Sequence, residues 1–570
     1  MANRALRRKR RKQKQDKAFE TKKSGVGRPL LFLALGGLLL VGAITRISYL
    51  DRSLWLDEAW VANSIRSGSL YQAFYYDDWL QTTPPLFIVI SRLITTLFGA
   101  SNVAFRMLPV FAGIVSILLF SFIALRLLRP SYAMIATLLF VFNPRLILYS
   151  QSLKQYSTDV LSTLSFIAVG HMYMEKRTDR WFYVLVASFV ALSFLSYPMI
   201  VFSPFLLYAA VAGFDVRRNA GVDRRTIRLI CLRLVLVMVA GCLVNAINYW
   251  FFIRPNKSPA LVGFFLEGFY QGRDVSTFLE FYGSRLLTIP RMLFFGGGGP
   301  LPLVATLITV IGFIYPWRSR TTLADSRSSG TAILLTLPIM GSIALNLIGI
   351  FPLPEFNHRL LVFVFPTLVL AFALGLQCLA RFLCCFIASR IESFKAMTGE
   401  NAAGAILFAG LAVLGLLVFS SVGLQPYFAE EREDSEQAVA YLAQRVQAND
   451  VLYVHSSMRE QFRLYNRTTP VSAGKIVYGK IGMPCCPRKD YRRPTQESFM
   501  DIADEVSPLA DASTGGSLWL LITDRPLHWF VVRRNDIEIF ERILAQVNCE
   551  RNDQAWLAGV YVARFGCKPK

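Results

Sequence analysis

Two adjacent carboxylates, Asp57 and Glu58, follow the first long hydrophobic segment of this chain, where a spanning helix would leave the membrane. A transporter usually keeps its working charges near the middle of the membrane, facing a cavity. Carboxylates at the rim therefore favour chemistry on a membrane-borne or extracytoplasmic substrate. The alternative is a solvated Asp-Glu pair in an ordinary loop, and only further motifs can decide between the two interpretations.

The composition is typical of a polytopic α-helical membrane protein. The 570 residues are 54% hydrophobic and only 17% charged, which is too apolar for an ordinary soluble protein. The net charge of +23 is concentrated at the N-terminus and in short loops between hydrophobic segments. This distribution indicates positive-inside topology and contact with membrane lipids, and it disfavours a nucleic-acid partner. Residues 1–28 are expected to form a basic cytoplasmic tail.

Eleven hydrophobic segments approach the length of about 20 residues that a spanning helix needs. They lie near residues 30–50, 106–128, 131–149, 157–175, 181–197, 198–213, 229–252, 300–317, 331–351, 359–383 and 402–422. An odd number of spans places the two termini on opposite sides of the membrane. We therefore expect a transmembrane catalytic domain over residues 29–425 and an extracytoplasmic domain over residues 428–570.

A short apolar segment, Leu86–Phe98, determines the sidedness of everything after it. Counted as a span, it would move five basic loops outside, against the positive-inside rule. Treated as a helix in the membrane interface, it leaves those loops cytoplasmic. The loops are Arg126–Arg129, Lys176–Arg180, Arg217–Arg228, Arg318–Arg327 and Arg381–Lys395. This topology brings Asp159 to the same side as Asp57.

The tail at 428–570 has the pattern of a small α/β domain. Ser435 is expected to cap a helix that runs to Val446. Strand-like runs follow at Val451–Val454, Leu518–Ile522 and Val560–Val562, with a helical stretch at 536–547. No glycine-rich phosphate loop accompanies them.

The cysteines divide along the same domain boundary. Five lie in or near predicted spans, where burial explains them: Cys231, Cys242, Cys378, Cys384 and Cys385. The outer domain contains Cys485, Cys486, Cys549 and Cys567, which allow three disulfide pairings in an oxidising compartment. A zinc site is disfavoured because no histidine lies at ligand spacing among them.

Several motifs share the outer side of the predicted topology and occur in a characteristic order. They are Thr82-Thr83-Pro84-Pro85-Leu86-Phe87, Phe105-Arg106, Asn143-Pro144, the stretch Tyr149–Asp159, and Asn357-His358-Arg359. Together they resemble the GT-C superfamily of membrane glycosyltransferases, on the branch of the polyprenyl-phosphate-mannose protein mannosyltransferases and the aminoarabinose transferase of lipid A. The likeness covers roughly residues 30–425. Related sequences often carry a Glu where this chain has Ser152, so any role of that carboxylate is absent or moved here.

The resemblance implies a GT-C-like fold and an inverting glycosyltransferase that moves a sugar from a polyprenyl-phosphate donor to a protein, lipid or glycan acceptor. Asp57 is the expected base, because removing the proton of an attacking hydroxyl accelerates transfer by about 10² to 10⁴. Lys154 and Arg359 are expected to bind the donor phosphate, since a phosphate leaving group needs fixed cations. No cofactor is required, and no metal site is indicated. We expect the protein in a bacterial inner (plasma) membrane.

The other candidates each have a structural alternative. Glu58 orients the acceptor, pairs with a neighbouring cation or is only a solvated side chain. Asp159 either holds Lys154 or the acceptor, or only favours the start of the fourth span. Four further residues are candidate substrate contacts: Pro85, Tyr156, Tyr197 and His358. Pro85 could instead set the entry angle of the interfacial helix, and Tyr197 could be an interfacial aromatic.

Two other classes of protein compete with a glycosyltransferase. A transporter or lipid-carrier flippase would have charges at mid-membrane, broken helices and an internal repeat, and the sequence shows no repeat and few central charges. A scaffold or receptor would leave the acidic and proline motifs of the first loop unexplained.

The topology can be tested by labelling single cysteines with a membrane-impermeant reagent in a cysteine-free background. We expect Leu80→Cys to be labelled from outside and Val222→Cys only after the membrane is permeabilised, because the loop at 217–228 is basic. Labelling of both positions from one side would contradict the arrangement.

Overall fold

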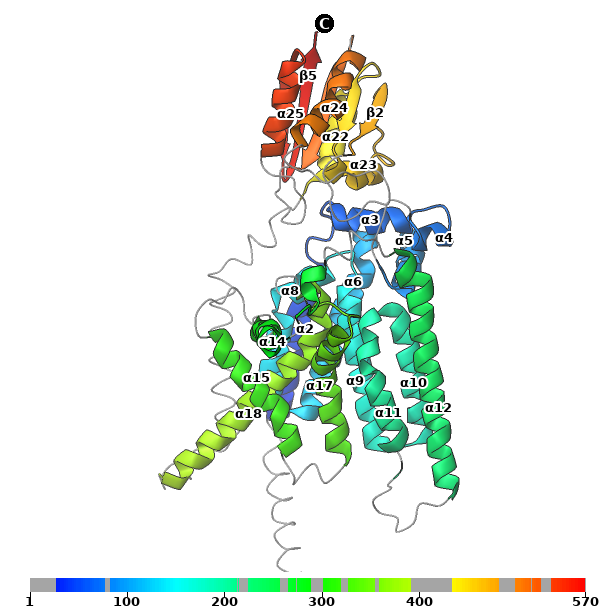
Figure 1. Ribbon diagram of the computed structural model, residues 1–570. Helices are drawn as coiled ribbons and strands as arrows, with labels where there is room; N and C mark the ends of the chain where they lie inside the picture. Colours follow the sequence, from blue (N-terminus) through cyan, green and yellow to red (C-terminus); the bar gives the residue numbers. More distant parts are fainter. Residues whose placement is uncertain are drawn as a thin grey trace, which may run out of the picture.

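A computed structural model describes residues 27–76, 82–212, 214, 224–256, 265–272, 274–288, 301–318, 326–353, 358–390, 433–480, 498–513, 515–523 and 535–568. Helices form one elongated body, and a small α/β domain lies at one end of it, next to helix α3 (Figure 1). The structure thus combines apolar helices with a small sheet region, as the predicted fold class requires.

The helical body contains long helices and several short connecting turns. Its first half consists of α2 (Gly27–Ile47), α3 (Leu56–Ile65), α4 (Leu70–Phe74), α5 (Pro85–Phe98), α6 (Asn102–Leu127), α7 (Pro130–Val141), α8 (Pro144–Ser150), α9 (Tyr156–Lys176), α10 (Asp179–Leu195), η1 (Tyr197–Phe202) and α11 (Ser203–Ala212). Its second half consists of α12 (Arg224–Ile247), η2 (Asn248–Ile253), η3 (Arg254–Asn256), η4 (Leu266–Gly268), α14 (Val275–Thr288), α15 (Leu301–Arg318), α17 (Ser326–Leu347), η6 (His358–Val364) and α18 (Phe365–Arg390).

Four stretches of the described chain are long and apolar enough to cross a membrane: Asn102–Leu127, Arg224–Asn256, Gly330–Leu347 and Arg359–Leu383. A fifth is reached if α7 and α8 count as one bent span. Three other predicted spans coincide with shorter apolar helices, Phe32–Ile47, Tyr197–Ala212 and Leu303–Pro316. The predicted span at 402–422 lies outside the described residues, so the count of eleven stays a prediction.

The predicted span at 131–149 is broken in the structure. Helices α7 and α8 meet at an angle of 54°, and the break falls at Asn143-Pro144. Pro144 occupies the first position of α8, and the Asn143 side chain accepts a hydrogen bond from the Leu146 amide. A proline at this position starts a new helix more easily than it continues an old one. The break turns the chain toward the loop that carries Lys154.

The C-terminal domain, which we call the outer domain after its predicted location, is a five-stranded mixed sheet in the order β2-β1-β3-β5-β4. Its strands are β1 (Val451–Val454), β2 (Lys475–Tyr478), β3 (Ser517–Thr523), β4 (Cys549–Leu557) and β5 (Val560–Cys567). Its helical elements are α22 (Ser435–Arg445), η7 (Ser456–Met458), α23 (Arg459–Tyr465), α24 (Ser498–Ala512) and α25 (Asn535–Gln546). Strands β1, β2 and β3 are parallel, whereas β5 is antiparallel to β3 and β4.

Three details of the outer domain differ from or refine the prediction. The helix cap is Asp434, whose carboxylate accepts from the Gln437 amide, and Ser435 is the first helical residue. Strands β2 and β4 were not predicted. The described residues contain a disulfide bond between Cys549 and Cys567 on neighbouring strands, which belongs to one of the three allowed pairing schemes. Cys485 and Cys486 lie outside the described residues.

Candidate active site

Helix α3 carries the two carboxylates of the first predicted outer loop. Asp57 and Glu58 are both in its first turn, where the partial positive charge of a helix N-terminus favours acidic side chains. Asp57 is 8% exposed and Glu58 is 2% exposed. These side chains are therefore not a solvated pair in an ordinary loop, which was the alternative to a functional interpretation.

Asp57 lies between the two predicted phosphate-binding cations. Its Oδ2 atom is 3.1 Å from Nη1 of Arg359 and 3.9 Å from Nζ of Lys154. Arg359 belongs to η6, and Lys154 lies in the loop between α8 and α9. Three segments that are far apart in the sequence thus bring a carboxylate and two cations together at one end of the helical body.

Glu58 has a different environment, because its partner is the buried guanidinium of Arg106 on α6. The Oε1 and Oε2 atoms of Glu58 accept from Nε at 3.1 Å and Nη2 at 2.7 Å, which is a bidentate pair. Oε1 also accepts from the Leu153 amide at 2.6 Å. Of the three alternatives for Glu58, the structure shows pairing with a cation, and its carboxylate fixes the loop next to Lys154.

Arg106 was part of a motif in the sequence but had no predicted role. Besides Glu58, its guanidinium donates to the backbone carbonyls of Leu50, Arg52 and Ser53. The chain between α2 and α3 therefore wraps around one buried side chain. In the sequence, the only sign of this arrangement is that Arg106 stands at the start of a predicted span.

The N-terminal turn of α9 adds Tyr156 and Asp159 to the same region. The Tyr156 ring packs edge-to-face on Tyr149, with ring centroids 4.8 Å apart, and its hydroxyl is within electrostatic range of Asp57, Arg359 and Asp159. Asp159 is 7% exposed, lies beside Ser196, and its Oδ1 atom has no hydrogen-bond partner of normal geometry in the described part of the chain.

The proline motif and Tyr197 are joined by a hydrogen bond. The Tyr197 hydroxyl donates to the Thr83 carbonyl at 3.0 Å. Pro85 is buried as the first residue of α5, and Pro84 is the cap residue before it, which fits the alternative that the prolines set the entry angle of this helix. His358 begins η6, but its side chain lies outside the described residues.

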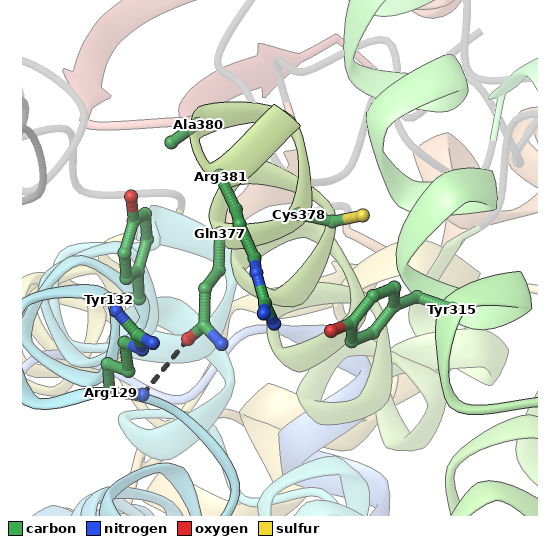
Figure 2. Close-up of a pocket in the computed structure, with 7 residues that line it drawn as sticks. All are labelled: Arg129, Tyr132, Tyr315, Gln377, Cys378, Ala380 and Arg381. Atoms are coloured by element: carbon green, nitrogen blue, oxygen red, sulfur yellow. Dashed lines mark hydrogen bonds between the residues drawn. The ribbon is translucent and has the colours of Figure 1, made fainter. Parts of the chain in front are cut away.

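A cavity of about 20 Å³ lies at the opposite end of the helical body. It is lined by Arg129, Tyr132, Tyr315, Gln377, Cys378, Ala380 and Arg381 (Figure 2). Helix α6 runs for 26 residues, or about 39 Å, from the Asp57 end toward Arg129. The cavity has room for one or two water molecules. None of its lining residues belongs to the site around Asp57.

The described residues contain no group of three or more His, Cys, Asp or Glu side chains that could hold a metal ion. What they assemble is a buried carboxylate next to two cations, with further tyrosines and a second carboxylate nearby. Such a site can accept a proton and bind an anion at adjacent positions.

The family model of the dolichyl-phosphate-mannose-protein mannosyltransferases matches residues 82–244. This range contains the proline motif, Arg106, Lys154, Tyr156, Asp159 and Tyr197. The match supports the predicted resemblance to the protein mannosyltransferases over this part of the chain. Asp57, Arg359 and the outer domain lie outside the matched range, so any role proposed for them rests on the geometry described above.

Two solved structures are similar to this chain at low sequence identity. ArnT from Cupriavidus metallidurans, bound to undecaprenyl phosphate, is 16% identical with a TM-score of 0.49, over 94% of this chain and 98% of ArnT. The oligosaccharyltransferase AglB from Archaeoglobus fulgidus, in complex with an inhibitory peptide and a dolichol-phosphate, is 10% identical with a TM-score of 0.47, over 95% of this chain and 74% of AglB. None of the curated proteins matches the chain.

The Glu58–Arg106 pair predicts a strong effect on stability. Glu58→Ala leaves a buried guanidinium without its carboxylate, and we expect a loss of about 3 to 5 kcal/mol in the free energy of unfolding. The measurement is thermal unfolding of the purified protein in detergent.

A matched control is Glu175→Ala, because Glu175 pairs with Arg126 at a site where both side chains are more than 40% exposed. Loss of such a pair should change stability by about 0 to 1 kcal/mol. Equal unfolding temperatures for the two variants would show that the buried pair does not hold the structure together.

Proposed function

We propose that this protein is an inverting glycosyltransferase that moves a sugar from a polyprenyl-phosphate donor to an acceptor on the extracytoplasmic face of the membrane. The observation that carries the proposal is the contact of one buried carboxylate, Asp57, with two cations, Arg359 and Lys154. The family description, dolichyl-phosphate-mannose-protein mannosyltransferase, supports a lipid-phosphate carrier as the donor class.

Asp57 is the proposed general base. An acceptor hydroxyl is a weak nucleophile while it keeps its proton, so a carboxylate that takes the proton during attack lowers the barrier. The acceptor oxygen forms a bond to the anomeric carbon, and the bond from that carbon to the phosphate oxygen breaks. The proton goes to Asp57, and the polyprenyl phosphate leaves with the electron pair. Direct attack of this kind inverts the anomeric configuration.

Arg359 and Lys154 are the proposed ligands of the donor phosphate. Arginine offers a planar fork of donors, and lysine acts as a point charge. In the structure, the guanidinium of Arg359 already donates to Asp57. A bound donor phosphate competes with this carboxylate for the cation. Donor binding would thus exchange one ion pair for another and leave Asp57 able to accept a proton.

Comparison of the lipids and glycans of cells with and without the protein should identify the donor and the acceptor. A glycosyltransferase changes the covalent structure of an acceptor, whereas a transporter or flippase changes only the location of a lipid. Absence of any covalently altered glycan or lipid would count against the proposal.

With donor and acceptor identified, Asp57→Asn keeps the shape of the side chain and removes its basicity. We expect turnover to fall by about 10² or more, while expression and membrane insertion stay near wild type. Donor affinity should be equal or higher, because the variant no longer competes with the donor phosphate for Arg359. Asp51→Asn is the control, because Asp51 is an exposed carboxylate in the same loop. Undiminished turnover of Asp57→Asn would remove Asp57 as the base.

Arg359→Lys tests the phosphate site, because it keeps the charge and loses the planar fork. We expect weaker donor binding, measured as a higher donor KM or by direct titration with the polyprenyl-phosphate sugar. The control is Arg381→Lys near the other end of the same helical segment. If Lys154→Ala and Arg359→Ala both bound and used donor like wild type, the phosphate would have to bind elsewhere.

A further inference from the structure

The outer domain meets the helical body at helix α3, the element that carries Asp57. The parallel strands β1 and β3 end at Val454 and Thr523, and in open α/β sheets the crevice at such carboxyl ends is the usual ligand site. Here Glu433 connects Thr523 to the first residue of α3, and α3 lies beside this end of the domain (Figure 1). At the end of the sheet where other α/β domains bind a ligand, the outer domain therefore contacts helix α3 of its own chain.

Glu433 completes the N-terminus of α3. The cap residue Trp55 makes no side-chain cap hydrogen bond, so the first amides of the helix need another acceptor. The Oε2 atom of Glu433 accepts from the Leu56 amide at 3.3 Å, and it also accepts from Nε2 of Gln461 at 2.7 Å. A carboxylate at this position also interacts favourably with the helix dipole.

Further contacts hold α3 against the outer domain on both sides of Asp57. The Tyr465 hydroxyl accepts from the Leu54 amide at 2.6 Å, two residues before the helix. Near the other end of α3, Asn63 donates to the backbone oxygen and the carboxylate of Glu460 at 2.8 and 3.0 Å. Leu54 and Trp60 belong to one buried apolar cluster with the core of the outer domain.

We propose that Glu433 is a positioning residue, through which the outer domain fixes the first turn of α3 and the carboxylate of Asp57. Its catalytic consequence rests on the proposed function. Leu56, whose amide Glu433 binds, immediately precedes Asp57, so a shift of this turn displaces the carboxylate. A displacement of about 1 Å in a reacting group can cost about 10² in rate. The outer domain thereby becomes part of the catalytic centre without contacting substrate.

The first test compares Glu433→Ala with Glu433→Gln in the full-length protein. The alanine variant removes the acceptor of the Leu56 amide, and we expect kcat to fall at least 10-fold while the donor KM stays within about 2-fold. The glutamine variant keeps an acceptor oxygen and should recover much of the loss. Equal kcat values for wild type and Glu433→Ala would overturn the proposal.

The matched control is Glu436→Ala. Glu436 lies three residues away and accepts from Asn102 at the same domain junction, at 2.6 Å, but no described contact joins it to α3. If Glu436→Ala lowered kcat as much as Glu433→Ala, any weakening of the junction would suffice, and a specific positioning role would be wrong.

Hydrogen exchange of the full-length variants in lipid nanodiscs tests the contact between Glu433 and α3 and needs no activity assay. We expect faster exchange of peptides that cover residues 54–60 in Glu433→Ala and unchanged exchange in Glu436→Ala. Peptides from β3 and β5 should remain protected, which reports that the outer domain is folded. Unchanged exchange at α3 would overturn the proposal. If wild type transferred no sugar, the proposed function would fail, while the exchange result would still decide whether Glu433 fixes α3.

Discussion

The buried pair of Glu58 and Arg106 is the interaction on which the arrangement of the site depends. Arg106 binds three carbonyls of the chain between α2 and α3, and Glu58 binds the Leu153 amide next to Lys154. One ion pair thus joins the turn after α2, helix α3, helix α6 and the loop before α9. Because each hydrogen-bonding group of the pair is satisfied in a buried setting, the geometry is strict. Asp57 is adjacent to Glu58 in the same helical turn, so this junction also fixes the position of Asp57.

The two adjacent carboxylates differ in their surroundings, and these surroundings suit them to different roles. Glu58 is enclosed and paired in bidentate fashion, which suits a structural role. Asp57 shares its contacts between a cation at 3.1 Å and one at 3.9 Å, and the longer distance marks a weaker pair. A carboxylate held this way can exchange partners when an anion arrives, whereas exchange at Glu58 would expose an unpaired guanidinium in the core. Chemistry that needs a changing charge state is therefore better placed on Asp57.

Much of the fold followed from the sequence, because hydrophobic length and charge placement report on a membrane protein directly. The buried runs Val451–Val454 and Leu518–Ile522 were recognisable as strands. Strand β4 was not, since most of its side chains are exposed and lack alternation. Sidedness alone placed Asp57, Lys154 and Arg359 in one region. The partners Arg106 and Glu433 escaped prediction, because their contacts join residues 48 and 377 positions apart and leave no local pattern.

The missing cap of α3 explains why the outer domain and the membrane site form one unit. A helix of 10 residues is too short to be stable in water on its own, and α3 begins without a side-chain cap. Its stability must come from tertiary contacts, and many of these belong to the outer domain. The same short helix carries both carboxylates of the first loop. A domain that supplies the cap and packs against apolar residues of α3 thus controls how rigidly Asp57 is presented, although it lies outside the residues that match the mannosyltransferase family.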